Sequence, residues 1–340
     1  MLAPTSDPQM HDDFEASKIT AFSNGLLIIS WVTMTLAVGN LWVGVPRDYY
    51  EYLPWYDNLF AYFDYTQSRF EPGFYALAWI FRYVLGANFN FFIGFIAAVS
   101  LGIKFWLFKR YLHYPIIGVL LYSAIFFPIH EYTQYRAALS LSFGYLAVHF
   151  LLEKRWALTI LLFIIAISLH GSSILLFIVA FGGYFLRGNK AALVILCFTI
   201  LFSLYFSDLR NLIEQLFNII NPLTSAYISN TANLEDVTIY SINNIFFMAM
   251  CGFAIIAGYY QRTRYHMLFL TISITSITPI ILLSDSPIIA QRAKEVLFVA
   301  MVFLVCRSQF RLKDTPVLAF AVAQAFLLLY LRVREGVLFS

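Results

Sequence analysis

The sequence predicts an all-α protein that crosses a membrane about ten to twelve times, counted as apolar runs of spanning length. Hydrophobic residues make up 61% of the 340 residues and charged residues only 12%, and a soluble domain of this length is not that apolar. The apolar runs recur along almost the whole chain, as in polytopic helical membrane proteins. The alternation of apolar and polar residues that marks an outer-membrane barrel does not occur.

The charge and the cysteines exclude further classes. A formal net charge of +3 is too small to indicate binding to nucleic acid. The cysteines fall inside apolar runs, without the spacing of a metal site or a disulfide framework, and are Cys197, Cys251 and Cys306. Three histidines lack a histidine or carboxylate at metal-ligand spacing, and these are His130, His149 and His266. We therefore expect no metal and no other cofactor.

The first part of the predicted architecture is a short tail, a span and a long loop. Residues 1–20 form a polar cytoplasmic tail, with no cleavable signal peptide expected ahead of it, and one transmembrane domain fills residues 21–333. Its first span, at 22–44, leads into an outer loop at 45–71 that is rich in tyrosine and acidic residues. A loop of this length is more often functional than idle, although an interfacial belt explains most of its tyrosines better than sugar stacking does.

The remaining elements are spans, with one exception. The apolar segment 73–85 begins after Pro72, a residue suited to a first helical position. At about 14 residues it is too short to cross a bilayer, so we expect it to be re-entrant or interfacial. A second long loop occupies residues 207–240. The expected spans are 89–108, 115–129, 135–152, 156–170, 172–186, 191–206, 241–260, 266–284, 288–307 and 316–332.

Basic residues indicate the orientation of these spans. Lysine and arginine gather in particular connectors, at 109–110, 154–155, 187–190, 262–264 and 307–313. The positive-inside rule makes these connectors cytoplasmic. Both long loops then lie on the outer side of the membrane, provided that segment 73–85 does not cross it.

Ionisable groups collect at the outer ends of several segments, where their cost in a membrane protein makes them indicators of function. They are Asp48, Glu71, Arg136, His170 and Arg292. At 1.5 Å per residue, His170 lies about 22 Å along a helix from Arg155, near the outer edge of a hydrocarbon core about 30 Å thick. Arg136 is similarly far from Lys154 on the preceding span. The spacings permit these groups to meet at one outer-facing cavity.

The residue types in this set suit one kind of chemistry. The planar guanidinium of an arginine pairs two oxygens at once, which suits a diphosphate. A carboxylate or a histidine suits a general base that takes a proton from a sugar hydroxyl. Asp48, Glu71 and His170 are all candidates for that base, and the spacing does not choose among them.

Each of these residues also has a structural interpretation. Arg136 can be an interfacial arginine whose charged head reaches the membrane surface. His170 can mark a helix–turn–helix corner in which a following serine caps the next helix. Glu71 can favour the start of a helix electrostatically, and Asp48 can be a turn residue. Arg292 can form a structural network with the charged residues that follow it.

Five short motifs follow one another in order through residues 22–310. They are Arg47–Tyr49, the acidic, small and aromatic residues of Glu71–Phe74, the pair Gln134 and Arg136 before a small-residue helix, His170–Ser173, and Gln291–Arg292 at the head of a late span. In this order they resemble the EpsG family of bacterial exopolysaccharide proteins, which belongs with the Wzy-type polysaccharide polymerases. Two departures bear on the roles of Arg47 and Gln134. Arg47 directly abuts Asp48 without a glycine-containing gap, and Gln134 is one residue closer to its arginine than in the family.

The resemblance implies a GT-C-like polymerase in the inner membrane of a bacterium, with its active site facing the periplasm or the outside of the cell. Such proteins join lipid-linked oligosaccharide repeat units into exopolysaccharide, capsule or O-antigen, and a chain-length regulator is an expected partner. A sugar hydroxyl attacks the anomeric carbon of a glycan on undecaprenyl diphosphate, and the lipid diphosphate leaves. The resemblance implies that Arg136 and Arg292 hold the diphosphate, with Arg47 and Gln134 as further substrate-binding residues. Arginines can neutralise the leaving group, so this chemistry requires no metal.

Two other functions fit part of the pattern. A transporter or flippase for a lipid-linked glycan also needs arginines that face a cavity, but transporters often show internal repeats and none is detectable in this sequence. A membrane acyltransferase that modifies a polysaccharide needs a histidine with an acid partner, and His170 suits that role. The paired arginines suit a diphosphate better than an acyl donor.

Overall fold

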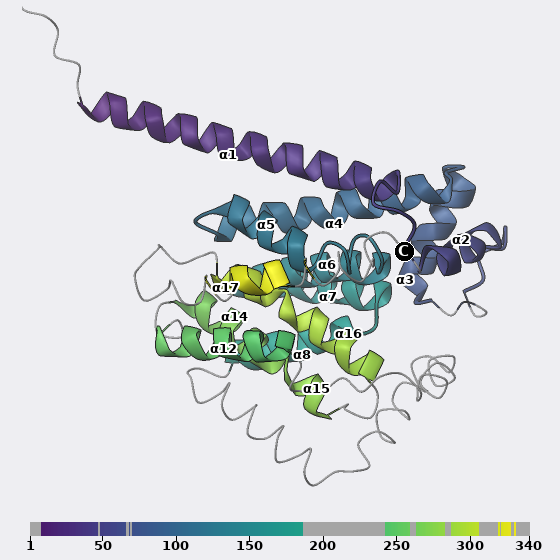
Figure 1. The fold of residues 1–340 in the computed structure, drawn as a ribbon. Helices are drawn as coiled ribbons and strands as arrows, with labels where there is room; N and C mark the ends of the chain where they lie inside the picture. Colours follow the sequence, from purple (N-terminus) through teal and green to yellow (C-terminus); the bar gives the residue numbers. More distant parts are fainter. Residues whose placement is uncertain are drawn as a thin grey trace, which may run out of the picture.

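The chain folds into a helical structure that confirms the predicted all-α class (Figure 1). A computed structural model describes residues 8–46, 48–65, 68, 70–185, 242–258, 263–282, 287–305, 319, 321–327 and 330. Within these residues every regular element is a helix and no strand occurs. The expected span at 191–206, the second long loop at 207–240 and Arg47 lie outside the described residues.

The first layer pairs α1 (Pro8–Gly39) with α4 (Phe89–Tyr111). A Cβ added to Gly39 would lie 3.3 Å from the Cα of Gly94, and the converse holds, so glycine at both positions lets the two backbones approach closely. Trp31 of α1 donates its indole N–H to the carbonyl of Ala98 at 2.8 Å. The helix begins earlier than the span expected at 22–44 and ends at Gly39, where a turn leads toward residues 48–84.

A second group of elements lies at one end of this helix pair (Figure 1). The predicted outer loop contains α2 (Tyr49–Asp57), and the short apolar segment forms α3 (Pro72–Trp79), which continues as the π-helix η1 (Ile80–Val84). Arg82 of η1 donates to the side chain of Asp57 at 2.9 Å and to its carbonyl at 2.7 Å, which ties η1 to the end of α2. Helix α2 therefore lies inside the loop expected at 45–71, and α3 begins directly after that loop.

The centre of the fold is α6 (Tyr135–Leu152), which packs against α4, α7 (Trp156–Leu169) and α8 (Ser173–Phe185). The bounds of α6, α7 and α8 agree with the expected spans to within a residue or two, and α4 runs three residues beyond its expected end at 108. Helix α5 (Pro115–Ile125) ends four residues before its expected span does, and turns through residues 126–134 lead from it into α6. Those turns bring Glu131 into the interior, beside α4.

A buried ion pair fixes that inward turn. The side chains of Lys104 and Glu131 are 1% and 0% exposed, and the Lys104 ammonium is 2.6 Å from the Glu131 carboxylate. The ammonium also donates to the Ser100 hydroxyl at 2.7 Å and to the Ala138 carbonyl at 3.0 Å. Tyr122 donates to the carboxylate at 2.7 Å. All three ammonium hydrogens therefore have acceptors, as a charge buried in an apolar interior requires.

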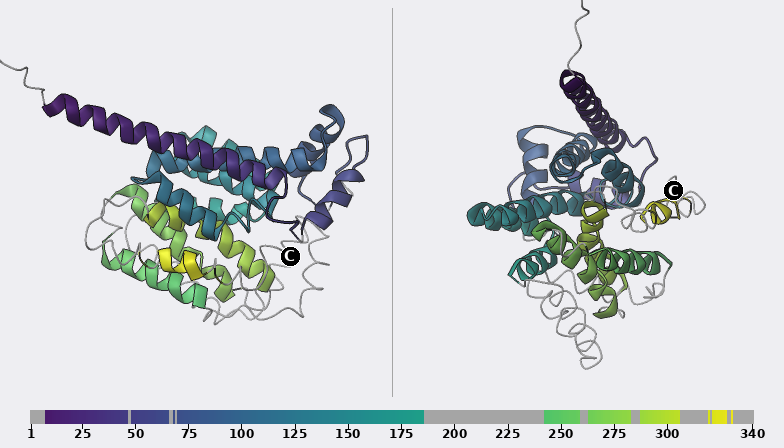
Figure 2. Two further views of the ribbon diagram at one scale, coloured as in Figure 1. Left: turned by 45° about the horizontal axis from the view of Figure 1, so that its top comes forward. Right: turned by 90° about the vertical axis from the view of Figure 1, so that its left-hand side faces the viewer.

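The remaining helices form a layer on the other side of α6 from α1 (Figure 2). They are α12 (Ile242–Ile256), α14 (Arg264–Thr275), α15 (Thr278–Leu282), α16 (Pro287–Phe298) and α17 (Ala300–Val305). Tyr145 of α6 donates to the carbonyl of Val296 at 3.1 Å and so docks α16 on the central helix. The expected span 266–284 is broken by a turn after α14, just ahead of Pro279, which lacks a backbone donor. The expected span 288–307 is broken at Val299.

Two helices among the described residues, α4 and α6, are both long and apolar enough to cross a membrane. The other apolar helices are shorter, at 10–17 residues, and include the second half of α1, α5, α7 and α8. Many of their large apolar side chains face outward, with Ile164 59%, Ile178 57% and Leu120 63% exposed. A water-facing helix would seldom expose a row of such residues, whereas a lipid-facing one does.

Candidate functional site

The candidate site forms where α3, the start of α6 and the α7–α8 corner meet. Glu71 is the residue before α3 and has an extended backbone, with Pro72 at the first helical position. A Cβ on Gly73 would lie 2.4 Å from the Ser168 hydroxyl and 2.8 Å from the Ser168 carbonyl oxygen. Only glycine therefore lets α3 pack this tightly on the end of α7. That close packing carries the Glu71 side chain to His170.

The Glu71 carboxylate joins three segments of the chain. One oxygen, Oε2, forms an ion pair with Nη1 of Arg136. The other, Oε1, accepts the backbone N–H of Gly171 at 3.0 Å and lies 3.1 Å from Nδ1 of His170. Burial alone would raise the pKa of Glu71, but Arg136, His170 and the Gly171 N–H outweigh it and hold that pKa well below the usual range. Glu71 is therefore a charged anchor at neutral pH.

Arg136 is held from three sides and keeps one edge open. Its Nε donates to the Tyr52 hydroxyl at 2.9 Å, and Nη1 is bound by Glu71. The guanidinium carbon lies 4.3 Å from the centre of the Phe70 ring, a cation–π contact. No hydrogen bond to Nη2 occurs among the residues that the structure describes. Arg136 stands in the first turn of α6, where unpaired N–H groups and the helix dipole also favour an anion.

His170 ends α7 in an extended conformation that turns its ring toward Glu71. The corner is fixed by Ser140 of α6, whose hydroxyl donates to the Ala166 carbonyl at 2.6 Å. Burial lowers the pKa of His170, although the hydrogen bond and charge of Glu71 act in the opposite direction. The imidazole is therefore neutral at pH 7, and a neutral ring next to a carboxylate places its hydrogen on Nδ1. The lone pair on Nε2 has no donor within the described part of the chain.

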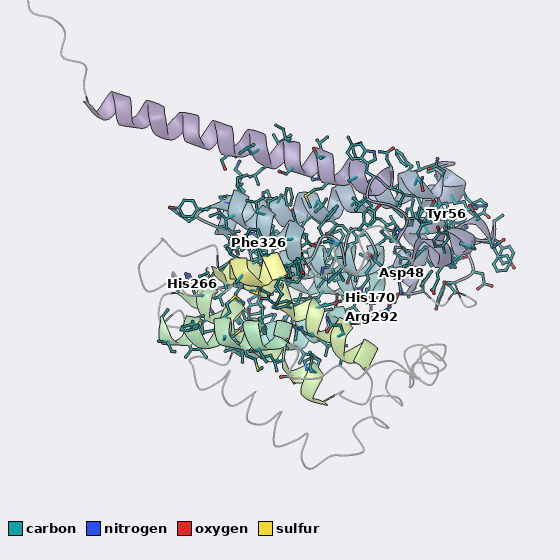
Figure 3. All side chains as sticks on the ribbon, in the orientation of Figure 1. Asp48, Tyr56, His170, His266, Arg292 and Phe326 are labelled. Atoms are coloured by element: carbon teal, nitrogen blue, oxygen red, sulfur yellow. The ribbon has the colours of Figure 1, made fainter. Side chains whose placement is uncertain are left out.

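Arg292 and Asp48 border this cluster. Figure 3 shows Arg292 of α16 beside His170, and the charge of Arg292 acts on both His170 and Tyr52. Asp48, the residue before α2, acts electrostatically on Tyr52 as well. Arg136 thus bonds the Tyr52 hydroxyl while Arg292 and Asp48 act on it electrostatically.

Gln134 faces a neighbouring polar group rather than the Glu71 cluster. It is the residue before α6, and its side chain acts on the carboxylate of Glu295 in α16. Gln291, one turn earlier on α16, donates to the same carboxylate at 2.8 Å. Because Gln134 and Gln291 act on the same carboxylate, the start of α6 lies close to α16, next to Arg292. Within the described residues, Gln134 therefore does not contact the Glu71 cluster directly and is connected to it through α16, the helix that carries Arg292.

The geometry groups most of the residues expected from the sequence and adds two that were missed. Glu71, Arg136 and His170 are in direct contact, and their catalytic and binding roles stay predictions. Tyr52 and Phe70, which clasp Arg136, were not expected, because the tyrosine-rich loop resembled an interfacial belt. The spacing of Tyr52 could have indicated it, since Tyr52 stands one helical turn after the candidate Asp48 and would lie on the same face of a helix. No group of three or more histidine, cysteine or acidic residues in the described ranges is arranged to hold a metal.

Comparison with protein families gives a match that includes every residue of this site. The sequence profile of the EpsG family matches residues 25–334. Curated proteins and solved structures give no match to the chain. The family match spans nearly the full length and agrees with the resemblance seen in the ordered motifs. The chain therefore belongs to the EpsG family.

Proposed function

We propose that this protein is a polysaccharide polymerase that joins oligosaccharide units carried on a polyprenyl diphosphate. Its family is associated with exopolysaccharide biosynthesis. The observation that carries the proposal is the Glu71 carboxylate shared between Arg136 and His170. Oε2 of this carboxylate orients Arg136, which can bind an anionic leaving group. Oε1 orients His170, which can accept a proton from a hydroxyl.

Arg136 and Arg292 are proposed to hold the diphosphate of the donor. Arg136 keeps Nη2 unbonded within the described residues, so it can bind a phosphate oxygen without breaking its contacts to Glu71 and Tyr52. Arg292 lies beside His170 and supplies a second positive charge. Charge on the departing diphosphate is largest in the transition state, so preorganised arginines lower the barrier to departure. This neutralisation proceeds with no cofactor.

His170 is proposed as the general base. Glu71 is a weak base because its pKa is held low and both of its oxygens are already bonded. Nε2 of His170 accepts no hydrogen bond from the described residues. Glu71 holds the ring hydrogen on Nδ1, which keeps the lone pair of Nε2 available for a proton. In the reaction, Nε2 takes the proton of an acceptor sugar hydroxyl. The hydroxyl oxygen forms a bond to the anomeric carbon, and the bond from that carbon to the diphosphate breaks with both electrons going to the lipid diphosphate.

The proposed setting is the inner membrane of a bacterium, crossed about ten to twelve times, with the site at the periplasmic side. The outward apolar residues of α5, α7 and α8 support contact with lipid. The basic connectors at 109–110 and 154–155 lie at the ends of α4 and α6 away from Arg136 and Glu71, which supports an outer-facing site. Lipid-linked glycan reaches the site laterally from the bilayer, and a chain-length regulator is a candidate partner.

One observation favours a different function, a membrane acyltransferase that modifies a polysaccharide. The pair His170 and Glu71 is the histidine with an acid partner that acyl transfer to a hydroxyl requires. The same carboxylate also binds Arg136, and a buried arginine with an open edge has no evident task in acyl transfer. We therefore place the polymerase first. A flippase can be distinguished from both enzymes by experiment, because loss of a flippase would leave the lipid-linked glycan on the inner face of the membrane.

The proposal is tested in a deletion strain that expresses the wild-type protein or the variant Arg136→Ala, Arg292→Ala or His170→Gln at matched levels. Lipid-linked glycans are separated on a gel, and their membrane face is determined with a probe that does not cross the bilayer. Single repeat units on the outer face, without long chains, support the polymerase. Units held on the inner face indicate a flippase, and long chains that lack acyl groups indicate an acyltransferase. Arg82→Ala, which removes a partly exposed arginine outside the Glu71 cluster, is the control and is expected to keep normal chains.

A further inference from the structure

The hydroxyl of Tyr52 has half of its hydrogen-bonding capacity unused. Tyr52 is 5% exposed, and its ring stacks on Phe70 at 4.9 Å with an interplanar angle of 11°. The phenolic oxygen accepts the Nε–H of Arg136 at 2.9 Å. No acceptor for its own O–H occurs among the residues that the structure describes. Among the described residues Tyr75 and Tyr135 also bury hydroxyls without a hydrogen-bond partner, so what distinguishes the open O–H of Tyr52 is its place beside the Arg136 guanidinium.

The position of the hydroxyl indicates which ligand it would bind. Its oxygen is bonded to Arg136, and the charge of Arg292 also acts on it. Burial raises the pKa of Tyr52, although the two arginines act in the opposite direction, so the phenol keeps its proton at neutral pH. The site therefore offers a neutral O–H donor among guanidinium groups. This combination of donors suits an anion with several oxygens.

We propose that the Tyr52 hydroxyl donates a hydrogen bond to a diphosphate oxygen of the substrate, which Arg136 and Arg292 hold. This inference rests on the proposed function and adds a binding residue to it. The hydrogen bond from Arg136 draws electron density from the phenolic oxygen, which strengthens the phenol as a donor. The stacked ring of Phe70 fixes the direction of the hydroxyl before the substrate arrives.

The same helix supplies a matched control. Tyr56 stands one turn after Tyr52 on α2 and is 0% exposed. Its hydroxyl already donates to the carbonyl of Ala87 at 2.8 Å, and Figure 3 shows it well apart from Arg292 and His170. Tyr52→Phe and Tyr56→Phe therefore remove the same atom from two buried rings of one helix. Only the first removes a donor that is free for a ligand.

The test uses purified full-length protein in nanodiscs and inorganic pyrophosphate as the probe, with affinity read from protection against thermal unfolding. Tyr52→Phe is expected to raise the Kd for pyrophosphate about tenfold, the usual effect of losing a hydrogen bond to a charged group. Tyr56→Phe is expected to lower the unfolding midpoint and leave the Kd unchanged. An unchanged Kd in Tyr52→Phe overturns the inference while leaving the proposed function intact. If the wild-type protein does not bind pyrophosphate, the diphosphate site itself is wrong and the inference falls with it.

A second variant separates direct binding from mere positioning of Arg136. Replacing Tyr52 with 3-fluorotyrosine makes the phenol more acidic, so it becomes a stronger donor and a weaker acceptor. At pH 6, where the phenol keeps its proton, a donor to the diphosphate tightens pyrophosphate binding after fluorination. A hydroxyl that serves only to accept from Arg136 weakens it. The sign of the change decides between the two roles, and it also serves if Tyr52→Phe fails to fold.

Discussion

Replacing Glu71 with glutamine tests the central contact of the site with little change in shape. If the amide oxygen takes the place of Oε1, it still accepts from Gly171 and His170, and the NH2 group faces Nη1 of Arg136, which is a donor; if the amide is turned over, the NH2 group faces the Gly171 N–H and Nδ1 of His170. At least one donor of the site loses its partner whichever way the amide turns. The variant also removes the negative charge that holds Arg136 and fixes the hydrogen on His170.

The expected loss of stability is about 2 kcal/mol, the typical contribution of a hydrogen bond to a charged group. The expected loss of polymerising activity lies between about a hundredfold and ten-thousandfold, because the base loses its orienting partner and the wrong tautomer becomes accessible. The charge of Glu71 raises the pKa of His170. The variant therefore lowers that pKa further, and the acid limb of the pH–activity profile moves to lower pH.

The assay uses protein in nanodiscs with lipid-linked repeat units isolated from the deletion strain, and it measures chain formation across a range of pH. Asp57→Asn is the matched control. It also converts a carboxylate that is paired with an arginine into an amide, but at a position outside the Glu71 cluster. That pair is exposed, so its loss changes stability by no more than about 1 kcal/mol. Equal activities in the two variants, or an acid limb that stays in place in Glu71→Gln, would refute the assignment of Glu71 as the partner of His170.

Three further predictions concern the frame around the site. Lys104→Met leaves Glu131 buried without its cation, and the unfolding midpoint should fall by the equivalent of about 3–5 kcal/mol, with partial recovery when Glu131→Gln is added. Gly73→Ala should lower activity sharply because its Cβ would lie 2.4 Å from the Ser168 hydroxyl, whereas Gly182→Ala, with no atom within 4 Å, should behave as wild type in the same gel assay. Stability should fall as the pH drops from 7 to 4 in a thermal-unfolding series. The folded pKa of His170 lies below its ordinary 6.5, so its contribution is lost as the pH falls through 6.5, whereas Glu71, whose folded pKa lies far below 4.5, loses its contribution only below pH 4.5.

Hydrophobic runs and charge placement predicted the helices well because those signals are local. The bounds of α6 equal those expected, and α7 and α8 differ by a residue or two. The breaks after Thr275 and at Val299 were not expected, since composition there stays apolar and only the later Pro279 hints at an interruption. The inward turn that carries Glu131 was also missed, because an acidic residue in a connector normally indicates solvent.

The site was predictable as a set of residue types at helix ends but not as a set of contacts. Nothing in the spacing of Glu71, Arg136 and His170 shows that one carboxylate bonds both partners. That arrangement depends on Gly73, whose missing Cβ lets α3 approach Ser168. The contact between Tyr52 and Arg136 arises from packing between segments that are distant in sequence. The spacing of hydrophobic residues within each segment does not predict such a contact.

Two of the charged clusters among the described residues differ in how completely their polar atoms are used, and this difference bears on their roles. Around Lys104 and Glu131 every ammonium hydrogen and both carboxylate oxygens have partners, so nothing is left for a ligand. Around Glu71 the carboxylate is fully bonded, yet Nη2 of Arg136, Nε2 of His170 and the hydrogen of Tyr52 lack partners among the described residues. Leaving such groups unpaired in an apolar protein is unfavourable. Open polar atoms also occur singly elsewhere, at Glu295 and Tyr75 for example, so the distinguishing feature of the Glu71 cluster is that three open groups, two donors and one acceptor, surround one charged carboxylate, as binding of an anion and a hydroxyl would require.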